Sequence, residues 1–226
     1  DAYGYLQGVW VRSEENPIDL SDEKSFLDYI SNVDSACYES DLKYFRWNTV
    51  LDFQGKDETL LHTIADRKEH QPEAISYYKD ASKTEKTDSC SNFGSLQAIK
   101  VVKRNQSGVI LELELDFQNG AVSVQSEYNM RAILGCGITN ISLLDGSSVE
   151  MSILPSAYIS IQAKGDGTYA VLGGGYGHGI GMSQNGANGM AKAGMGYQDI
   201  LNYFYQDTEL TELYQPQNMT KEEGGA

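Results

Sequence analysis

The sequence has few cysteines, and their spacing excludes the common zinc motifs. Its 226 residues include only Cys37, Cys90 and Cys136, and none of them belongs to a CxxC or CxxH pair. Structural zinc sites usually need such closely spaced ligands, so we expect this chain to hold no metal ion and no cofactor. Cys136 lies in the apolar stretch LGCGI, which is typical of a buried thiol. A Cys37–Cys90 disulfide remains an alternative if the compartment is oxidising.

Positive charge and long apolar runs are also scarce. Lysine and arginine number 17 against 32 acidic residues, which gives a net charge of −15. Because phosphate backbones are bound through basic clusters, this balance argues against a nucleic-acid partner. The longest basic cluster, Lys100-Val-Val-Lys103-Arg104, alternates as a solvated strand surface would. The sequence contains neither an apolar run long enough for a transmembrane segment nor a signal-like leader at Asp1.

The residues that are present predict one globular domain with several helices. The hydrophobic fraction is 40% and the charged fraction 22%, values that suit a folded domain. Apolar residues at helical spacing predict helices near residues 21–33, 57–64, 127–134, 183–193 and 197–205. Acidic residues at the start of the first helix favour its positive dipole end, and Gly194 should stop the fourth.

Alternating apolar residues predict antiparallel strands in the middle of the chain. In residues 109–117, apolar side chains alternate with Glu112, Glu114 and Asp116, which predicts a half-buried strand with one face in solvent. The run LQAIKVVKR before it and the run AVSVQS after Asn119-Gly120 are its expected hairpin partners. SAYISIQA and TYAVLGG should pair across KGDG.

Hairpins and separate helices together indicate an α+β fold with a mainly antiparallel sheet. Residues 65–95 are polar and are predicted to form an exposed insertion or long loop. The polar residues 215–226 are predicted to be a disordered tail.

The stretch GGGYGHGIGMSQ, residues 173–184, is expected at a strand-to-helix junction in the C-terminal third. Its glycines do not match a phosphate-binding loop. Ser183 lacks the GxSxG turn of a serine nucleophile, and no acid in the motif orients His178. The glycines could simply let the chain pass tightly over a helix. However, Tyr176, His178, Ser183 and Gln184 offer neutral hydrogen-bonding groups and a ring beside an open backbone, which suits a sugar.

The C-terminal sequence from GGGYGHGIGMSQ to YFYQDTEL resembles the signature of the stage II sporulation protein D (SpoIID) family, which includes the amidase enhancers. Tyr176 stands where the family usually has tryptophan, and Asn185 where it often has tyrosine. EYNMRAILG resembles the family's arginine-bearing helix, with Arg131 as the matching residue, and KYFRWN and YLQGV resemble shorter segments. The signature residues that this sequence keeps are Gly175, Gly177, His178, Gly179, Gly181, Met182, Ser183, Gln184, Gly186, Ala187, Gly189, Met190, Ala191 and Gly194.

The resemblance implies work on bacterial peptidoglycan outside the cytoplasm, at the cell wall or membrane. Sporulation members of the family resemble lytic transglycosylases that cleave the MurNAc–GlcNAc bond of denuded glycan strands through one glutamate. That glutamate lies in a helix of the type EMP…ALKAQAVAARTYA, which has no match here, so we expect it upstream of Asp1, with any family zinc site. Residues 1–214 are then the C-terminal part of the domain, and a separate N-terminal half completes it.

Two function classes follow from the resemblance. In the first, this chain supplies the wall of a transglycosylase cleft but not its catalytic residue. In the second, it is a non-catalytic glycan-binding module or an enhancer of a peptidoglycan amidase or endopeptidase. The candidate substrate-binding residues are Tyr176, Gly177, His178, Ser183, Gln184 and Arg131.

Overall fold

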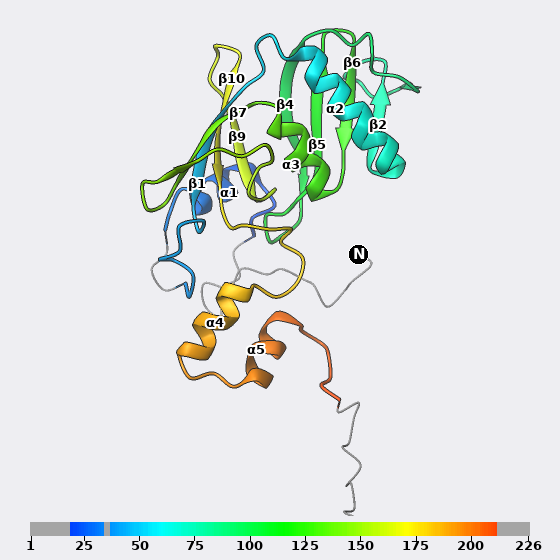
Figure 1. Cartoon of the computed structure of the whole chain (residues 1–226). Coiled ribbons are helices and arrows are strands. Elements are labelled where there is room, and N and C mark those ends of the chain that lie inside the picture. The colour runs from blue at the N-terminus through cyan, green and yellow to red at the C-terminus, as the bar shows by residue number, and fades with distance from the viewer. Residues whose placement is uncertain (1–18, 34–36, 212–226) are drawn as a thin grey trace, which may run out of the picture.

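The computed structural model describes residues 19–33 and 37–211. Over these residues the chain forms five α-helices and two antiparallel five-stranded sheets (Figure 1). The predicted α+β class with antiparallel pairing is therefore confirmed. The predicted disordered tail, residues 215–226, lies outside the described residues, as does the YLQGV segment.

The first sheet has the order β8-β7-β1-β10-β9. The hairpin predicted across KGDG is present as β9 and β10, and β10 pairs with the central strand β1. In this register Trp47 of β1 lies opposite Gly173 of β10. The strands of this sheet are β1 (Trp47–Asp52), β7 (Ile138–Leu143), β8 (Ser148–Val149), β9 (Ile159–Ala163) and β10 (Thr168–Gly173).

The second sheet has the order β3-β2-β6-β5-β4 and contains both hairpins predicted around residues 109–117. The prediction of a loop over residues 65–95 is wrong in part, because α2 extends to His70 and a strand follows it. Ile75 and Tyr77 of that strand are buried. The strands are β2 (Ile75–Tyr78), β3 (Lys86–Thr87), β4 (Leu96–Arg104), β5 (Ile110–Phe117) and β6 (Gly120–Val124).

The acidic face of β5 is less exposed than its alternating pattern predicts. Glu114 and Asp116 are only 5% and 8% exposed. Lys83, on the β2–β3 connection, lies 3.0 Å from a carboxylate oxygen of Glu112 and 2.8 Å from one of Glu114, and Lys100 pairs with Glu114 and Asp116. A distant loop thus covers a face that local alternation assigns to solvent.

The basic cluster at the end of β4 is also not wholly solvated. Arg104 is 5% exposed and forms an ion pair with Glu23. Its guanidinium also donates to the carbonyls of Gly108 and Ile159, at 2.8 and 2.7 Å. Arg104 thereby ties α1 to both sheets.

The helices fall close to their predicted positions, although the second is longer than expected. Asp22 caps the first helix by accepting from the N–H groups of Lys24 and Ser25. Gly194 follows the fourth helix with a φ of 93°. The helices are α1 (Glu23–Ile30), α2 (Asp57–His70), α3 (Glu127–Gly135), α4 (Gln184–Lys192) and α5 (Tyr197–Phe204), with a short 3-10 turn at Pro72–Ala74.

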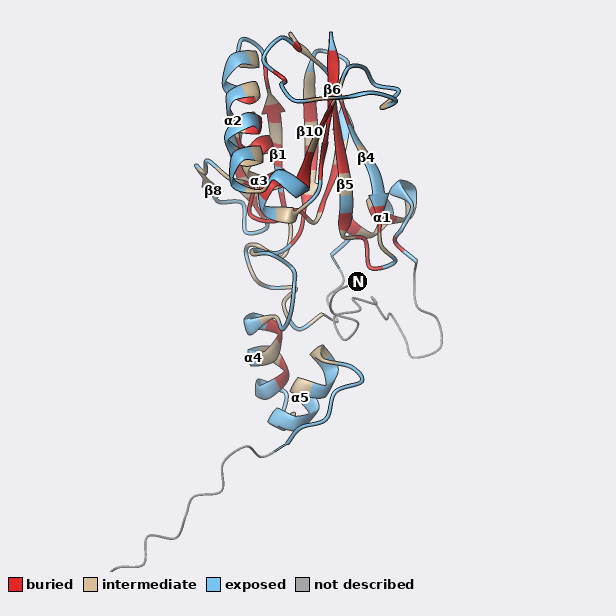
Figure 2. Cartoon of the chain, turned by 90° about the vertical axis from the view of Figure 1, so that its right-hand side faces the viewer, coloured by how far each residue is buried: buried red, intermediate tan, exposed pale blue. Residues whose placement is uncertain are grey.

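One hydrophobic core joins the two sheets to α2 and α3. Leu51, Leu113, Leu134 and Ile64 are fully buried members of this cluster. Figure 2 shows the buried residues concentrated in the strands and on the inner side of α2, whereas α4 and α5 stand below the sheets and are mostly exposed. Met190 and Ile200 are the buried hydrophobic residues of that helix pair. α4 and α5 thus lie outside the main core, and α4 packs on the segment that contains Tyr38 and Glu39.

The described cysteines form no disulfide, so the structure does not contain a Cys37–Cys90 bond. Cys90 is 3% exposed, while Cys136 is only partly buried and donates to the Thr63 hydroxyl at 3.2 Å. The expectation of a buried thiol thus fits Cys90 better than Cys136. Within the ranges that the structure covers, no helix has the length and apolar character needed to span a membrane.

Candidate functional site

The glycine-rich segment connects the end of β10 to the start of α4. Its first glycine is required by close packing. A β-carbon on Gly173 would lie 2.2 Å from Cζ2 of Trp47, the residue opposite it in the sheet. The indole is 2% exposed, and its Nε1 donates to the Gly175 carbonyl at 3.0 Å. The ring therefore packs directly against the backbone where the segment leaves the sheet.

The later glycines are required by backbone conformation. Gly175, Gly177, Gly179 and Gly181 all have positive φ values, between 72° and 130°. A β-carbon on the first three would meet nothing within 4 Å, so space is not what restricts them. Positive φ at four alternate residues strongly favours glycine, which adopts it without steric cost. The intervening side chains face solvent: Tyr176 is 63% exposed and Ile180 54%, and His178 is exposed as well.

Backbone hydrogen bonds fix the first half of this segment to two neighbouring stretches. The N–H of Gly175 donates to the Tyr44 carbonyl at 2.8 Å, and that of Gly177 donates to the Pro155 carbonyl at 2.9 Å. The Ser156 hydroxyl donates to the Gly174 carbonyl at 2.7 Å. These bonds tie residues 174–177 to the neighbouring stretches.

Two tyrosines form an aromatic surface beside the loop. The rings of Tyr44 and Tyr176 lie 4.8 Å apart between centroids and are tilted by 53°. The Lys43 ammonium lies 5.3 Å from the Tyr44 centroid. An exposed ring backed by a second ring offers the flat apolar face against which a sugar packs.

The His178 ring is oriented by its own loop. Its Nδ1 accepts a hydrogen bond from the Ile180 N–H at 2.8 Å. In the neutral ring the proton must then reside on Nε2, because one nitrogen donates while the other accepts. His178 consequently presents an Nε2–H donor at an exposed position.

Ser183 caps α4 and binds a carboxylate from a distant part of the chain. Its hydroxyl accepts from the Gly186 N–H at 3.0 Å and donates to Oε1 of Glu39 at 2.7 Å. The hydroxyl hydrogen is thus directed at Glu39, while the oxygen accepts the capping bond of α4. The adjacent helix residue Gln184 is exposed.

The residues around Glu39 also pack closely on α4. A β-carbon on Gly189 would lie 2.9 Å from Cβ of Tyr38, and one on Gly186 would lie 3.3 Å from Oε2 of Glu39. The small residues of α4 therefore let the segment around Tyr38 approach the helix backbone. Glu39 is partly buried, and it is the carboxylate that the structure places against the loop's end.

Arg131 does not join the exposed group. Its side chain is only 12% exposed; Nε donates to the Leu154 carbonyl at 2.8 Å, and its other end pairs with Glu127 at 3.0 Å. Leu154 precedes Pro155, whose carbonyl holds Gly177. Arg131 thus braces the stretch that positions the loop, one step away from the exposed residues.

Burial around the loop also affects Tyr158. Its carbonyl accepts from the Gly174 N–H at 3.0 Å, and its hydroxyl donates to the Ser107 carbonyl at 2.7 Å. Burial raises the pKa of this phenol well above its ordinary value. The phenol therefore stays neutral and keeps its hydroxyl hydrogen for the bond to the Ser107 carbonyl.

The predicted residues thus lie in three places. Tyr176, Gly177 and His178 lie on the exposed loop, Ser183 and Gln184 lie where it enters α4, and Arg131 lies behind it. Glu39, Tyr44 and Trp47 were not predicted as site residues. Within the described ranges, no three His, Cys, Asp or Glu residues are grouped so that they could hold a metal ion.

A protein-family model matches residues 67–181, half of the chain, and its description is "Domain of unknown function (DUF8618)". The chain belongs to this family. The matched DUF8618 region begins within α2 and ends in the glycine-rich loop, so it includes Tyr176 and His178 but not Glu39 or α4.

Curated relatives connect this DUF8618 member with the SpoIID family. It is 36% identical over 89 residues to the amidase enhancer of Bacillus subtilis, an alignment that covers 39% of this chain and 12% of that protein. It is 42% identical over 76 residues to the stage II sporulation protein D of the same organism, covering 33% of this chain and 22% of that protein. The predicted SpoIID relationship is thus confirmed, although the alignments span less than a quarter of either relative.

Proposed function

We propose that this chain has a cell-wall role and that its glycine-rich loop binds the glycan strands of peptidoglycan. The single observation that carries the proposal is the exposed loop, hydrogen-bonded to its neighbours as far as Gly177, that presents Tyr176 and His178. A ring face and a neutral N–H donor suit a sugar, whose ring carries both apolar faces and hydroxyl groups. The names of the relatives, sporulation protein D and amidase enhancer, support a role at the cell wall.

In this proposal the chain forms one wall of a lytic transglycosylase cleft in an extracytoplasmic protein. The general acid is a glutamate of the remaining N-terminal half of the domain, and this chain orients the strand against it. Transglycosylase chemistry needs one carboxyl group that first gives and then takes a proton. The role of this chain is accordingly to bind and orient, through Tyr176, the Gly177 backbone, His178 and Gln184.

Glycan binding is tested with a pair of His178 variants. His178→Asn places an amide oxygen near the position of Nδ1 and keeps an acceptor for Ile180, but it removes the Nε2–H donor. His178→Gln keeps a donor near the position of Nε2 but removes the acceptor for Ile180. If the donor contacts sugar, His178→Asn weakens binding of denuded glycan strands roughly two- to ten-fold, the effect of one neutral hydrogen bond, and His178→Gln retains more affinity.

Binding is measured by calorimetry, with circular dichroism to confirm that each variant is folded. Equal affinities of His178→Asn and the unaltered chain would reduce His178 to a structural residue. If neither the unaltered chain nor the Tyr176→Ala variant binds strands, glycan binding by this chain is refuted.

Cleavage is tested separately, on the parent polypeptide that carries the glutamate-bearing segment. Mass spectrometry should detect anhydro-MurNAc ends after incubation with denuded strands. If this chain alone released such ends, the acid would have to lie within it, and the cleft-wall assignment would be wrong. Glu39, beside the loop, would then be the first residue to replace.

An amidase-enhancing role is the second candidate, and the relative named amidase enhancer favours it. In that case the chain binds wall glycan or a peptidoglycan amidase without cutting strands. Adding the chain to a purified amidase should then increase stem-peptide release from intact peptidoglycan while no anhydro ends appear. An unchanged rate of release would remove this candidate.

A further inference from the structure

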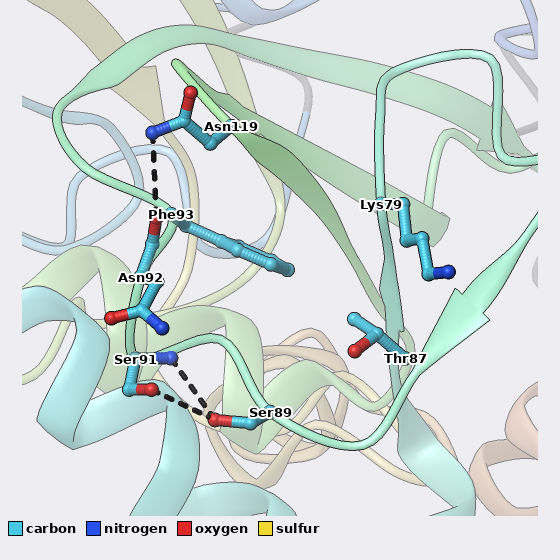
Figure 3. Close-up of a pocket in the computed structure, with 7 residues that line it drawn as sticks. All are labelled: Lys79, Thr87, Ser89, Ser91, Asn92, Phe93 and Asn119. Carbon is cyan, nitrogen blue, oxygen red and sulfur yellow. Dashed lines mark hydrogen bonds between the residues drawn. The ribbon is translucent and has the colours of Figure 1, made fainter.

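A pocket of about 440 Å³ lies in the second sheet region, among residues that are not part of the glycine-rich loop. Its walls come from the β2–β3 hairpin, the segment after β3 and the turn between β5 and β6. The volume falls within the range of small-ligand sites. The lining residues are Lys79, Thr87, Ser89, Ser91, Asn92, Phe93 and Asn119 (Figure 3).

Most of the side chains that line this pocket are polar and uncharged. It carries three hydroxyl groups and two amides, all of which can both donate and accept hydrogen bonds. Lys79 is the only charged residue among the seven, and its ammonium pairs with Glu85. Phe93 contributes little apolar surface, because it is only 4% exposed.

These groups define the class of ligand by elimination. An anion would need an unpaired cation, and the one ammonium is already paired; the net charge of −15 opposes it further. A cation would need a carboxylate in the lining, and none of the seven residues is acidic. An apolar ligand would separate these hydroxyl and amide groups from water, which is costly because the bonds that some of them make with one another use only part of their capacity. A neutral ligand rich in hydroxyl or amide groups remains.

The walls are fixed before any ligand arrives. The Asn119 N–H donates to the Phe93 carbonyl at 2.9 Å, and the Ser91 N–H donates to the Ser89 hydroxyl at 3.2 Å. Behind them Phe93 packs so closely on Gly120 that a β-carbon there would lie 2.4 Å from the ring. A preformed site loses less entropy when it binds its ligand.

We infer that this pocket is a second carbohydrate site, which takes a neutral N-acetylated amino sugar. The neutral, polar class of the ligand follows from the lining alone. The choice of an amino sugar rests on the proposed function, in which the chain contacts glycan strands. Asn92 and Asn119 can pair with the acetamido group, and the hydroxyls of Thr87 and Ser89 with the ring.

The test follows backbone amide shifts by NMR while the full chain is titrated with N,N′-diacetylchitobiose. The amides of residues 87–93 and Asn119 should shift. Thr87→Val, which removes one hydroxyl and keeps the shape, should weaken the affinity roughly two- to ten-fold. Ser91→Trp should fill the pocket and abolish these shifts. Ser148→Trp, the same change at an exposed position on edge strand β8, is the matched control and should leave them intact.

The outcomes separate this inference from the proposed function. Shifts confined to residues 174–184 would overturn the pocket and leave glycan binding by the loop in place. Shifts confined to the pocket would support the second site and count against the loop. Unmoved pocket amides, or Ser91→Trp binding as tightly as Ser148→Trp, would overturn the inference.

Discussion

Replacing Gly173 by alanine tests why the glycine-rich segment begins where it does. The added methyl would lie 2.2 Å from Cζ2 of Trp47, far inside contact distance. The indole cannot easily yield, because it is 2% exposed and is held by its hydrogen bond to the Gly175 carbonyl. The backbone of β10 or the ring of β1 must therefore shift.

The cost of the shift can be estimated from its two parts. Overfilling a packed core costs about 1–3 kcal/mol, and the loss of one neutral hydrogen bond adds about 1 kcal/mol. We expect Gly173→Ala to lower the free energy of unfolding by about 2–4 kcal/mol. For a chain of this size that corresponds to a Tm lower by roughly 4–16 °C.

Unfolding in denaturant is followed by tryptophan emission in a Trp10→Phe background, so that Trp47 is the only tryptophan. Gly196→Ala is the control, because its β-carbon would meet only Oδ2 of Asp199, at an ordinary 3.5 Å. Equal stability of Gly173→Ala and Gly196→Ala would refute the packing argument.

A double-mutant cycle adds a second check on the same contact. Trp47→Phe removes the ring atoms that crowd Gly173, so in that background Gly173→Ala should cost at least about 1 kcal/mol less. Circular dichroism replaces fluorescence for these variants. Strictly additive effects would mean that the indole is not what excludes a side chain at this position.

Three further predictions concern the residues that hold the loop and the second sheet. Burial acts to raise the pKa of Glu114, but the hydrogen bonds with Lys83 and Asp116 and the positive charges of Lys83 and Lys100 together outweigh burial and keep the pKa below the ordinary 4.5. This stabilisation is therefore present above pH 4.5 and is lost as pH falls through the folded-state pKa. Lys83→Met should therefore lower the free energy of unfolding by roughly 1–3 kcal/mol at neutral pH, less than breaking a fully buried pair because Lys83 is 27% exposed. Denaturant titrations repeated in acid should show a smaller difference between Lys83→Met and the unaltered chain. A difference that does not depend on pH would contradict this. Glu39→Ala should release the Ser183 cap and speed proteolysis of the helix pair α4 and α5. Glu39→Gln keeps an acceptor for Ser183 and should not. Equal rates of proteolysis in the two variants would show that the contact does not restrain α4. Arg131→Met should weaken glycan binding by freeing the carbonyl that it holds; unaltered affinity, with the fold intact, would make this arginine purely structural.

Local sequence pattern was enough to predict most hairpins and helices. Asn119-Gly120 defined one turn, KGDG another, and the acidic residues after Ser21 the start of α1. Each of these features depends on neighbours within a few residues, so backbone preferences and side-chain capping decide it. The division of the strands between two sheets could not be predicted in this way, because it depends on pairings between distant segments such as β1 and β10.

The same distinction explains the errors over residues 65–95 and the face of β5. The polar composition of this region hides β2, whose Ile75 and Tyr77 are buried only because α2 and β6 pack around it. Glu114 looks solvent-facing in the sequence, yet Lys83 reaches across from another hairpin to cover it.

For the candidate site, local pattern alone is enough to identify residues 173–184 as a glycine-rich junction with exposed hydrogen-bonding residues, because alternate glycines impose their conformation locally. The residues that hold that junction come from distant parts of the chain and are identified only in the folded structure. Trp47 explains Gly173, Tyr44 backs Tyr176, and Glu39 engages Ser183, and each pair joins segments more than a hundred residues apart. Such contacts depend on strand register and on the approach of α4 to the segment around Tyr38, and neither is encoded in any short stretch of the sequence.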